Sequence, residues 1–265
     1  MSEVFIIDAI RTPIGSFLGQ YKKTDAVDLG SLCVEGIYNR NKNLNIKHVE
    51  GLILGQVLTA GLGMNTARQV LLKSELSQNS FAYCVNQVCG SGMRAVMETA
   101  LKIKSNENQL LVAGGQESMS LARHTSLQRV VTKLGHDMMT DSILSEGLTD
   151  VFSKDHMGIT AENVARRYKV TRLEQDEFAF HSYKKAYNAL KKNYFKNELI
   201  SGPLVDEVRQ GTKLEKLSSL KAVFKKNGTV TAGNASSLND GASMLLIGSS
   251  KYCDSNKIKP IAKII

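Results

Sequence analysis

The stretch that decides the fold reads Val85-Asn86-Gln87-Val88-Cys89-Gly90-Ser91-Gly92-Met93. An apolar run over residues 81–85 leads into it and predicts a buried strand, and residues 93–104 behind it predict a helix. Cys89 is therefore expected at a strand-to-helix turn, where the free N–H groups and positive dipole end of a helix stabilise an anion such as a thiolate. The glycines that follow it carry no Cβ and permit close approach of backbone or substrate.

The turn alone leaves two interpretations of Cys89 open. A cysteine can be an inert small hydrophobe in the core, or a nucleophile whose reactivity depends on its thiolate. The 265 residues include four cysteines, Cys33, Cys84, Cys89 and Cys253, with no C-x-x-C pair and no His at metal-ligand spacing. We therefore expect no disulfide framework and no metal site, and a reducing, cytoplasmic setting.

The net charge of the chain limits the classes of molecule that it is expected to bind. Lys and Arg number 34 and Asp and Glu 25, so the net charge is +9. The Lys residues are scattered and are not interleaved with aromatic side chains, which favours a solvated surface over a nucleic-acid platform. A further interpretation is that part of the charge serves an anionic ligand. No apolar run approaches the ~20 residues of a membrane span, and the start lacks the pattern of a secretory signal.

Short apolar runs alternate with helical patterns through most of the chain. Strands are expected over residues 4–10, 49–57, 81–85, 110–113, 243–247 and 261–265, and helices over residues 25–38, 66–73, 93–104 and 249–256. This alternation predicts an α/β sheet with largely parallel strands and helices packed on it. Cys33 falls on the apolar side of its helix and is expected in the core.

The middle of the chain differs from the rest in composition and in its apolar pattern. From Ser120 strand-like runs become rare and charge increases, and a capping box from Thr171 to Glu174 opens a long helix towards Phe195. We therefore expect a core of residues 1–119 plus 243–265, with residues 120–242 inserted as a mixed helix and loop domain.

Several motifs in order along the chain resemble the thiolases. From the N-terminus they are A-I-R-T-P-I-G (residues 9–15), the turn N-Q-V-C-G-S-G (residues 86–92) and V-A-G-G-Q-E-S-M-S (residues 112–120). Then follow D-H-M-G-I-T-A-E-N (residues 155–163) and G-T-V-T-A-G-N-A-S-S-L-N-D-G-A (residues 228–242). The whole chain is similar to the N-terminal half of an acetyl-CoA acetyltransferase (acetoacetyl-CoA thiolase). The resemblance implies an α/β layer with a mixed sheet covered by helices, carrying an inserted loop domain that binds coenzyme A.

The resemblance also implies roles for particular residues. Cys89 would be the acylated nucleophile, since a thiolate both attacks an acyl group and leaves from it. Asn86 would either act there directly or hold the loop by side-chain to backbone hydrogen bonds. Contacts to coenzyme A are implied for Leu148, His156, Met157, Arg209, Val223, Phe224, Ala232, Ser236 and Leu238. The family commonly has Gly where this chain has Ser237, and a Cβ there would either narrow the pantetheine tunnel or shift the loop.

The resemblance to the thiolases also limits the activity that we expect of this chain. Thiolases complete their site with an N-E-A motif, a G-H-P histidine and a C-x-G-G-G cysteine from a C-terminal half, and none of these is in the sequence. Cys253, in K-Y-C-D, is no substitute. We therefore expect the chain alone to be nearly inactive and to present an apolar face to the missing half. Homodimers or homotetramers are implied, with acetyl-CoA or acetoacetyl-CoA as substrate and no permanently bound cofactor.

Two alternatives remain. One is a 3-ketoacyl-CoA thiolase of β-oxidation, which shares the nucleophile turn. The other is a stand-alone module that binds coenzyme A or acyl groups, or a subunit that depends on a partner for the second half.

Overall fold

The computed structural model describes residues 2–127, 136 and 138–265 of the chain. The chain divides into two compact units. The first contains Met1–Ala122, Asn197–Leu204 and Asn239–Ile265, and the second contains Arg123–Lys196 and Val205–Leu238. Residues 197–204, which fall within the expected insertion, lie in the first unit, where Arg11 N donates to Glu198 O at 2.7 Å.

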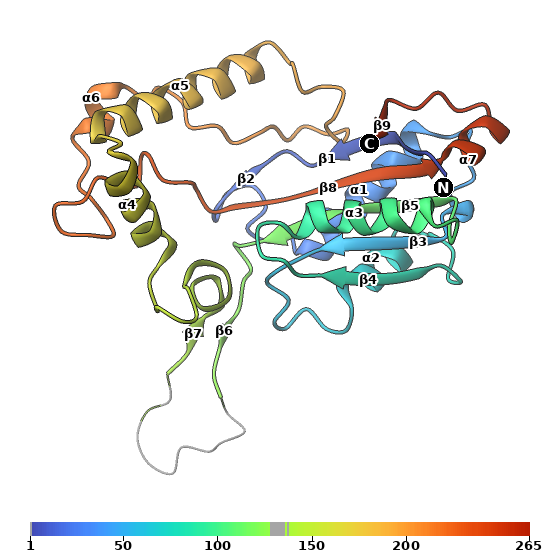
Figure 1. The fold of residues 1–265 in the computed structure, drawn as a ribbon, viewed down its shortest axis with the longest axis horizontal. Helices are drawn as coiled ribbons and strands as arrows, with labels where there is room; N and C mark the ends of the chain where they lie inside the picture. The colour runs from blue at the N-terminus through green and yellow to red at the C-terminus, as the bar shows by residue number, and fades with distance from the viewer. Residues whose placement is uncertain (1, 128–135, 137) are drawn as a thin grey trace. The chain divides into compact units, whose positions relative to one another are not determined.

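The first unit contains a seven-stranded sheet. Its strands lie in the order β4-β3-β5-β8-β1-β9, and β2 pairs with β8 (Figure 1). The strands are β1 (Val4–Arg11), β2 (Gly15–Ser16), β3 (Gly51–Gly55), β4 (Phe81–Val85), β5 (Leu110–Ser118), β8 (Asn239–Ser249) and β9 (Ala262–Ile264). The helices are α1 (Ala26–Arg40), the short 3-10 turn η1 (Ile46–His48), α2 (Thr66–Lys73), α3 (Ser91–Lys104) and α7 (Ser250–Ser255). The α/β fold class with a mixed sheet is confirmed.

The expectation of largely parallel strands is wrong for half of this sheet. Strands β4, β3 and β5 run parallel, because the crossovers through α2 and α3 return the chain to the same edge. Strand β8 lies between β5 and β1 and is antiparallel to both, and β9 is antiparallel to β1. The direction of β8 depends on the long segment that precedes it, which local apolar patterns do not report.

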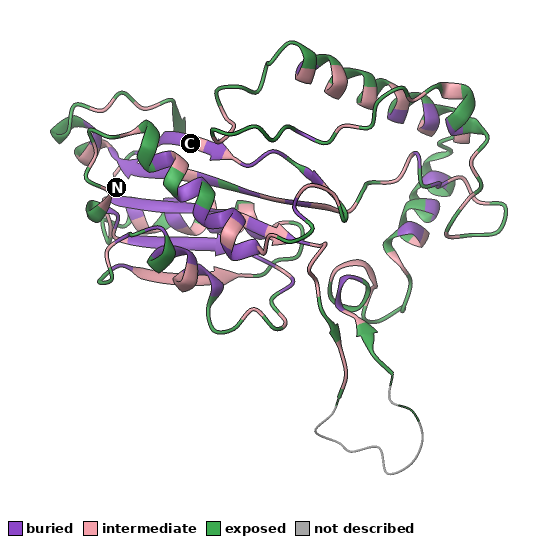
Figure 2. Cartoon of the chain, turned by 180° about the vertical axis from the view of Figure 1, so that it is seen from behind, coloured by how far each residue is buried: buried purple, intermediate pink, exposed green. Residues whose placement is uncertain are grey.

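The two faces of the sheet bury different helices. Leu110 and Val112 of β5 pack in the cluster that contains buried residues of α1 and α2, and the alternate residues Leu111 and Ala113 pack with those of α3. Figure 2 shows the central strands of this sheet buried and β4, at the edge, only partly so. Cys33 on α1 is fully buried, as expected, and burial raises the pKa of its thiol to about 12.

The second unit is mainly helical. It contains β6 (His124–Thr125), β7 (Thr140–Asp141), the π-helical turn η2 (Ile143–Leu148), α4 (Met157–Tyr168), α5 (Arg172–Lys191) and α6 (Leu214–Ser218). The capping box at Thr171 and Glu174 is confirmed, and α5 ends four residues before Phe195. Among the described residues, no helix is long and apolar enough to cross a membrane, and no three His, Cys, Asp or Glu side chains gather as metal ligands would.

Candidate active site

Cys89 is exposed and lies in the turn between β4 and α3, as the sequence predicts. Gly90 is the N-cap of α3 and gives no side-chain cap to the helix. The first N–H groups of α3 are therefore not all satisfied by a capping side chain, and they lie beside the thiol in the chain. The turn presents the Cys89 thiol to solvent at the N-terminal end of α3.

Two polar side chains close this turn. The side-chain oxygen of Asn86 accepts a hydrogen bond from Val88 N at 2.9 Å. Ser91 Oγ accepts from Gln87 N at 2.8 Å and donates to Val88 O at 2.6 Å. The contact of Asn86 is the side-chain to backbone bond that holds a loop, the second of the two roles open to it.

Val88, the residue before Cys89, has a backbone conformation that its side chain disfavours. Its φ is +49°, in the left-handed region, where a β-branched residue is strained by about 1–3 kcal/mol. Both backbone groups of Val88 are held, the N–H by Asn86 and the carbonyl by the hydroxyl and N–H of Ser91. The surrounding hydrogen bonds thus impose a bend that directs Cys89 outward.

Close packing beneath the turn depends on Gly55 rather than on Gly90 or Gly92. A Cβ on Gly55, at the end of β3, would lie 2.3 Å from the carbonyl carbon of Ser91 and 2.4 Å from Gly92 N. A Cβ on Gly92 would meet only ordinary contacts at 3.9 Å. The first turn of α3 therefore rests directly on the backbone of β3. A Cβ on Gly90 would lie 3.3 Å from Gln87 O, and the close approach of a substrate to Gly90 and Gly92 stays a prediction.

The outer side of α3 is apolar and exposed. Met93, Met97 and Leu101 follow one another at intervals of four residues and are 68%, 50% and 60% exposed. Residues at this spacing lie on one side of a helix. The opposite side of α3, with Ala100 and Ile103, packs on the sheet. This exposed apolar stripe is a candidate interaction surface.

The residues predicted to contact coenzyme A all lie in the second unit. His156 is the N-cap of α4, and its ring stacks on Phe224 with 4.7 Å between centroids and 17° between planes. A Cβ on Gly158 would lie 2.2 Å from the Phe224 ring, so glycine allows this stack. Because His156 Nδ1 accepts from Gly158 N at 2.9 Å, the proton of the neutral ring is on Nε2, which is left to donate. Met157 follows and is 41% exposed.

Backbone contacts bring further predicted residues next to this stack. Val223 N donates to Val230 O at 3.0 Å, and Ala222 bridges Thr231, the neighbour of the exposed Ala232. The segment that carries Val223 and Phe224 is therefore paired with the loop that begins the G-T-V-T-A-G-N motif.

Arg209 is connected to the same loop by Tyr183, whose ring it contacts. Its guanidinium lies 5.6 Å from the ring centroid of Tyr183, and the Tyr183 hydroxyl donates to Gly233 O at 2.9 Å. Leu148 is next to Thr149, which bridges His156. Ser236 is exposed and Leu238 is half-buried at the end of the unit.

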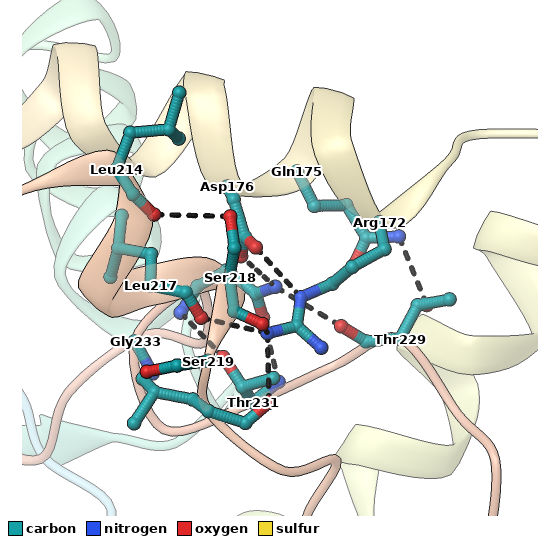
Figure 3. Close-up of polar contacts among 12 residues, drawn as sticks. Arg172, Gln175, Asp176, Leu214, Leu217, Ser218, Ser219, Thr229, Thr231 and Gly233 are labelled. Atoms are coloured by element: carbon teal, nitrogen blue, oxygen red, sulfur yellow. Dashed lines mark hydrogen bonds and ion pairs between the residues drawn. The ribbon is translucent and has the colours of Figure 1, made fainter.

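Two buried carboxylates organise these segments and were not among the predicted residues. Glu162 of α4 is 6% exposed and accepts from Thr229 N and Val230 N at 2.7 Å each. Asp176 of α5 is fully buried and accepts from Arg172 Nε at 2.8 Å (Figure 3). Helical spacing contained the signal, since Glu162 lies four residues after Gly158 and three before Ala165, all on the buried side of α4.

Positive charge is concentrated in the second unit. Its ranges hold 19 of the 34 Lys and Arg residues but 12 of the 25 Asp and Glu residues, a net charge of +7 out of +9. A unit with this imbalance attracts anions. Of the interpretations of the charge, an anionic ligand is the one that this distribution favours.

Known proteins resemble the chain over nearly its whole length. Residues 4–251 match the family described as "Thiolase, N-terminal domain". A probable acetyl-CoA acyltransferase of Staphylococcus aureus (strain COL) is 42% identical over 99% of this chain and 70% of its own length. The acetyl-CoA acetyltransferase of Paracoccus denitrificans is 41% identical over 100% of this chain and 70% of its own length.

Solved structures agree with these relatives. The acetyl-CoA acetyltransferase of Bacillus anthracis superposes with a TM-score of 0.94 at 33% identity, over 100% of this chain and 70% of the other. A thiolase from Ascaris suum in complex with coenzyme A gives 0.94 at 35% identity, over 99% of this chain and 70% of the other. The chain therefore spans about 70% of the length of each of these relatives.

Proposed function

Since this chain belongs to the thiolase family, we propose that it takes part in acetyl transfer between acetyl-CoA molecules, with Cys89 as the acyl carrier. The observation that supports this most is the exposed thiol in a turn braced by Asn86 and Ser91 at the start of α3. Relatives named acetyl-CoA acetyltransferase or acyltransferase favour the acetyl group as cargo.

The reaction proceeds in two steps. The Cys89 thiolate attacks the thioester carbonyl of acetyl-CoA and expels coenzyme A, which leaves an acetyl thioester on the protein. The methyl carbon of a second acetyl-CoA, once a base has removed its proton, attacks that acetyl group. Acetoacetyl-CoA forms and the thiolate of Cys89 is released, and thiolysis is the reverse.

Coenzyme A is a substrate here and no permanently bound cofactor takes part. We assign its binding to the second unit, through Leu148, His156, Met157, Arg209, Val223, Phe224, Ala232, Ser236 and Leu238. The assignment is supported by the stacked pair His156 and Phe224, by the Nε2–H of His156, which has no partner among the residues that the structure describes, and by the excess positive charge.

The groups that drive proton transfer come from outside these 265 residues. General acid–base catalysis contributes ~10²–10⁴-fold per group, and the sequence has neither a G-H-P nor a C-x-G-G-G motif. The exposed stripe Met93, Met97 and Leu101 on α3 is where the part that supplies them would pack. This part is either a further domain or a partner subunit, and the chain alone is nearly inactive.

Self-association is proposed through the free edge of β4. In the described part of the chain this strand ends the sheet and is only partly buried. Ala82 O accepts from Asn65 Nδ2 at 3.0 Å, and the remaining outer backbone groups can pair with another strand. The cytoplasmic location predicted from the cysteines and the absence of nucleic-acid and membrane partners remain predictions. A 3-ketoacyl-CoA thiolase acting on longer acyl chains would be recognised by a substrate-length series.

The test is thiolysis of acetoacetyl-CoA, measured with the 265-residue protein and its Cys89→Ala variant. We expect no turnover of the chain above the variant. One general acid or base contributes up to about 10⁴-fold to the rate. Turnover within about a hundredfold of an intact thiolase would therefore contradict the need for groups from outside this chain. Turnover measurable above a protein-free blank, if the variant matched it, would contradict the role of Cys89.

A further inference from the structure

Two segments of the second unit, residues 217–224 (the end of α6 and the loop after it) and residues 229–238, carry five of the nine coenzyme A contacts proposed above. Neither is held by a sheet. One guanidinium holds the first of them in place, because the Arg172 terminal nitrogen donates to Leu217 O at 2.7 Å and to Leu220 O at 2.8 Å. The same side chain donates from Nε to Asp176 at 2.8 Å (Figure 3).

The second segment is held from the other oxygen of the same carboxylate. Asp176 Oδ1 accepts from the amide of Asn234 at 2.9 Å, and the amide oxygen of Asn234 accepts from Thr231 N at 2.7 Å. Asn234 also donates to Thr229 O at 3.1 Å. Arg172, Asp176 and Asn234 therefore form a continuous chain of hydrogen bonds from one segment to the other, which we name the Arg172 relay.

Stability alone is a weak explanation for this arrangement. Asp176 is fully buried, and replacing a buried ion pair by apolar residues of similar size is often neutral or stabilising. What a hydrogen-bonded pair supplies and an apolar pair does not is a fixed direction for each group that it contacts. Loops ordered before binding also avoid the entropy cost of being ordered by the ligand.

We propose that the Arg172 relay positions both segments for coenzyme A, with Arg172, Asp176 and Asn234 as positioning residues that do not touch the ligand. The inference rests on the proposed binding of coenzyme A to this unit. Disconnecting the relay leaves the unit folded, but the two segments reach their binding arrangement only part of the time, which weakens apparent affinity by that fraction.

Two variants disconnect the relay in different ways. Asp176→Asn keeps the shape but replaces one of the two accepting oxygens by an NH2 donor, so the side chain cannot accept from both Arg172 and Asn234. Arg172→Lys keeps the positive charge, but an ammonium lacks the planar fork that reaches the carboxylate and the two carbonyls together. Because the role is geometric, both variants should raise the Kd for coenzyme A about tenfold.

A matched control separates positioning from stability. Ala179→Gly lies on the same helix and is buried, but it makes none of the relay contacts. Glycine within a helix lowers the thermal unfolding midpoint. Calorimetric titration of coenzyme A into each protein, well below its unfolding midpoint, gives the comparison. We expect the control to be less stable than wild type with an unchanged Kd.

The outcomes are distinct. If wild type binds coenzyme A and both relay variants bind it equally well, the inference is overturned while the proposed function stands. Loss of affinity in Ala179→Gly to the same extent as in the relay variants also overturns it, since affinity would then follow stability. If the wild-type protein shows no binding, the proposed function fails and this inference with it.

Discussion

Glu162 Oε1 lies 2.7 Å from the backbone nitrogen of Val230, so a buried carboxylate of α4 holds the start of the Gly-rich loop. The same oxygen accepts from Thr229 N, and the other oxygen accepts from Thr229 Oγ1 at 3.1 Å. His156 and Met157 begin α4, and Ala232 follows Val230 by two residues. Glu162 thus connects α4 to the Gly-rich loop within the second unit.

Removal of the carboxylate should destabilise this unit. Glu162→Ala leaves two buried N–H groups without an acceptor, and we expect the free energy of unfolding to fall by about 3 kcal/mol. Urea unfolding followed by circular dichroism measures the loss. The control is Glu177→Ala on α5, an exposed Glu, which should change stability by less than about 0.5 kcal/mol. Equal losses in the two variants would contradict the assigned role.

Stability should depend on pH through the same group. Burial alone raises the pKa of Glu162, but hydrogen bonds from Val230 and Thr229 outweigh it, and the net pKa lies below the ordinary value of 4.5. A lowered folded-state pKa contributes stability that is present above pH 4.5 and is lost as pH falls through the folded-state pKa. The advantage of wild type over Glu162→Gln in unfolding free energy should therefore shrink on acidification. An advantage that stays constant with pH would rule this out.

The four cysteines should react in an order set by exposure. Cys89 is exposed, whereas Cys33 is fully buried with a pKa raised to about 12 by burial. Iodoacetamide at mildly alkaline pH should label Cys89 first and leave Cys33 unmodified, as read by peptide mass spectrometry. In urea the difference should disappear. Labelling of native Cys33 as fast as Cys89 would show that the core around α1 is wrongly described.

A methyl group beneath the turn should disturb it. In Gly55→Ala the new Cβ meets backbone atoms of Ser91 and Gly92 that cannot move cheaply, and we expect a loss of about 1–3 kcal/mol. The labelling rate of Cys89 should change with it. Gly147→Ala is the control, because its Cβ would have no atom within 4 Å. An unchanged stability and labelling rate in Gly55→Ala would contradict the packing of α3 on β3.

The sequence predicts local elements well and their long-range arrangement poorly. Residues 66–73 and 81–85 form the expected helix and strand without shift, because Asn65 caps the helix and the apolar run is short and bounded. The antiparallel course of β8 and the support from Gly55 escape prediction, since both depend on segments distant in sequence.

The candidate site divides in the same way. The position of Cys89 follows from the strand-to-helix pattern, which is local. Asp176 and Asn234 lie 58 residues apart and meet through one hydrogen bond, so no spacing rule connects them. Apolar residues follow no clear helical period along α5, so neither the burial of Asp176 nor its partner was predicted.

The central claim is that Cys89 takes up the acyl group, and acetylation of the protein by acetyl-CoA, in which the Cys89 thiolate displaces coenzyme A from the thioester, tests it most directly. A single transfer to Cys89 requires no complete catalytic cycle, so it can be followed by peptide mass spectrometry even where turnover is negligible. We predict one acetyl group on Cys89, slowed by excess free coenzyme A and absent from Cys89→Ala. Acetylation spread over several cysteines, or an unmodified Cys89 in a protein that binds coenzyme A, would contradict the account.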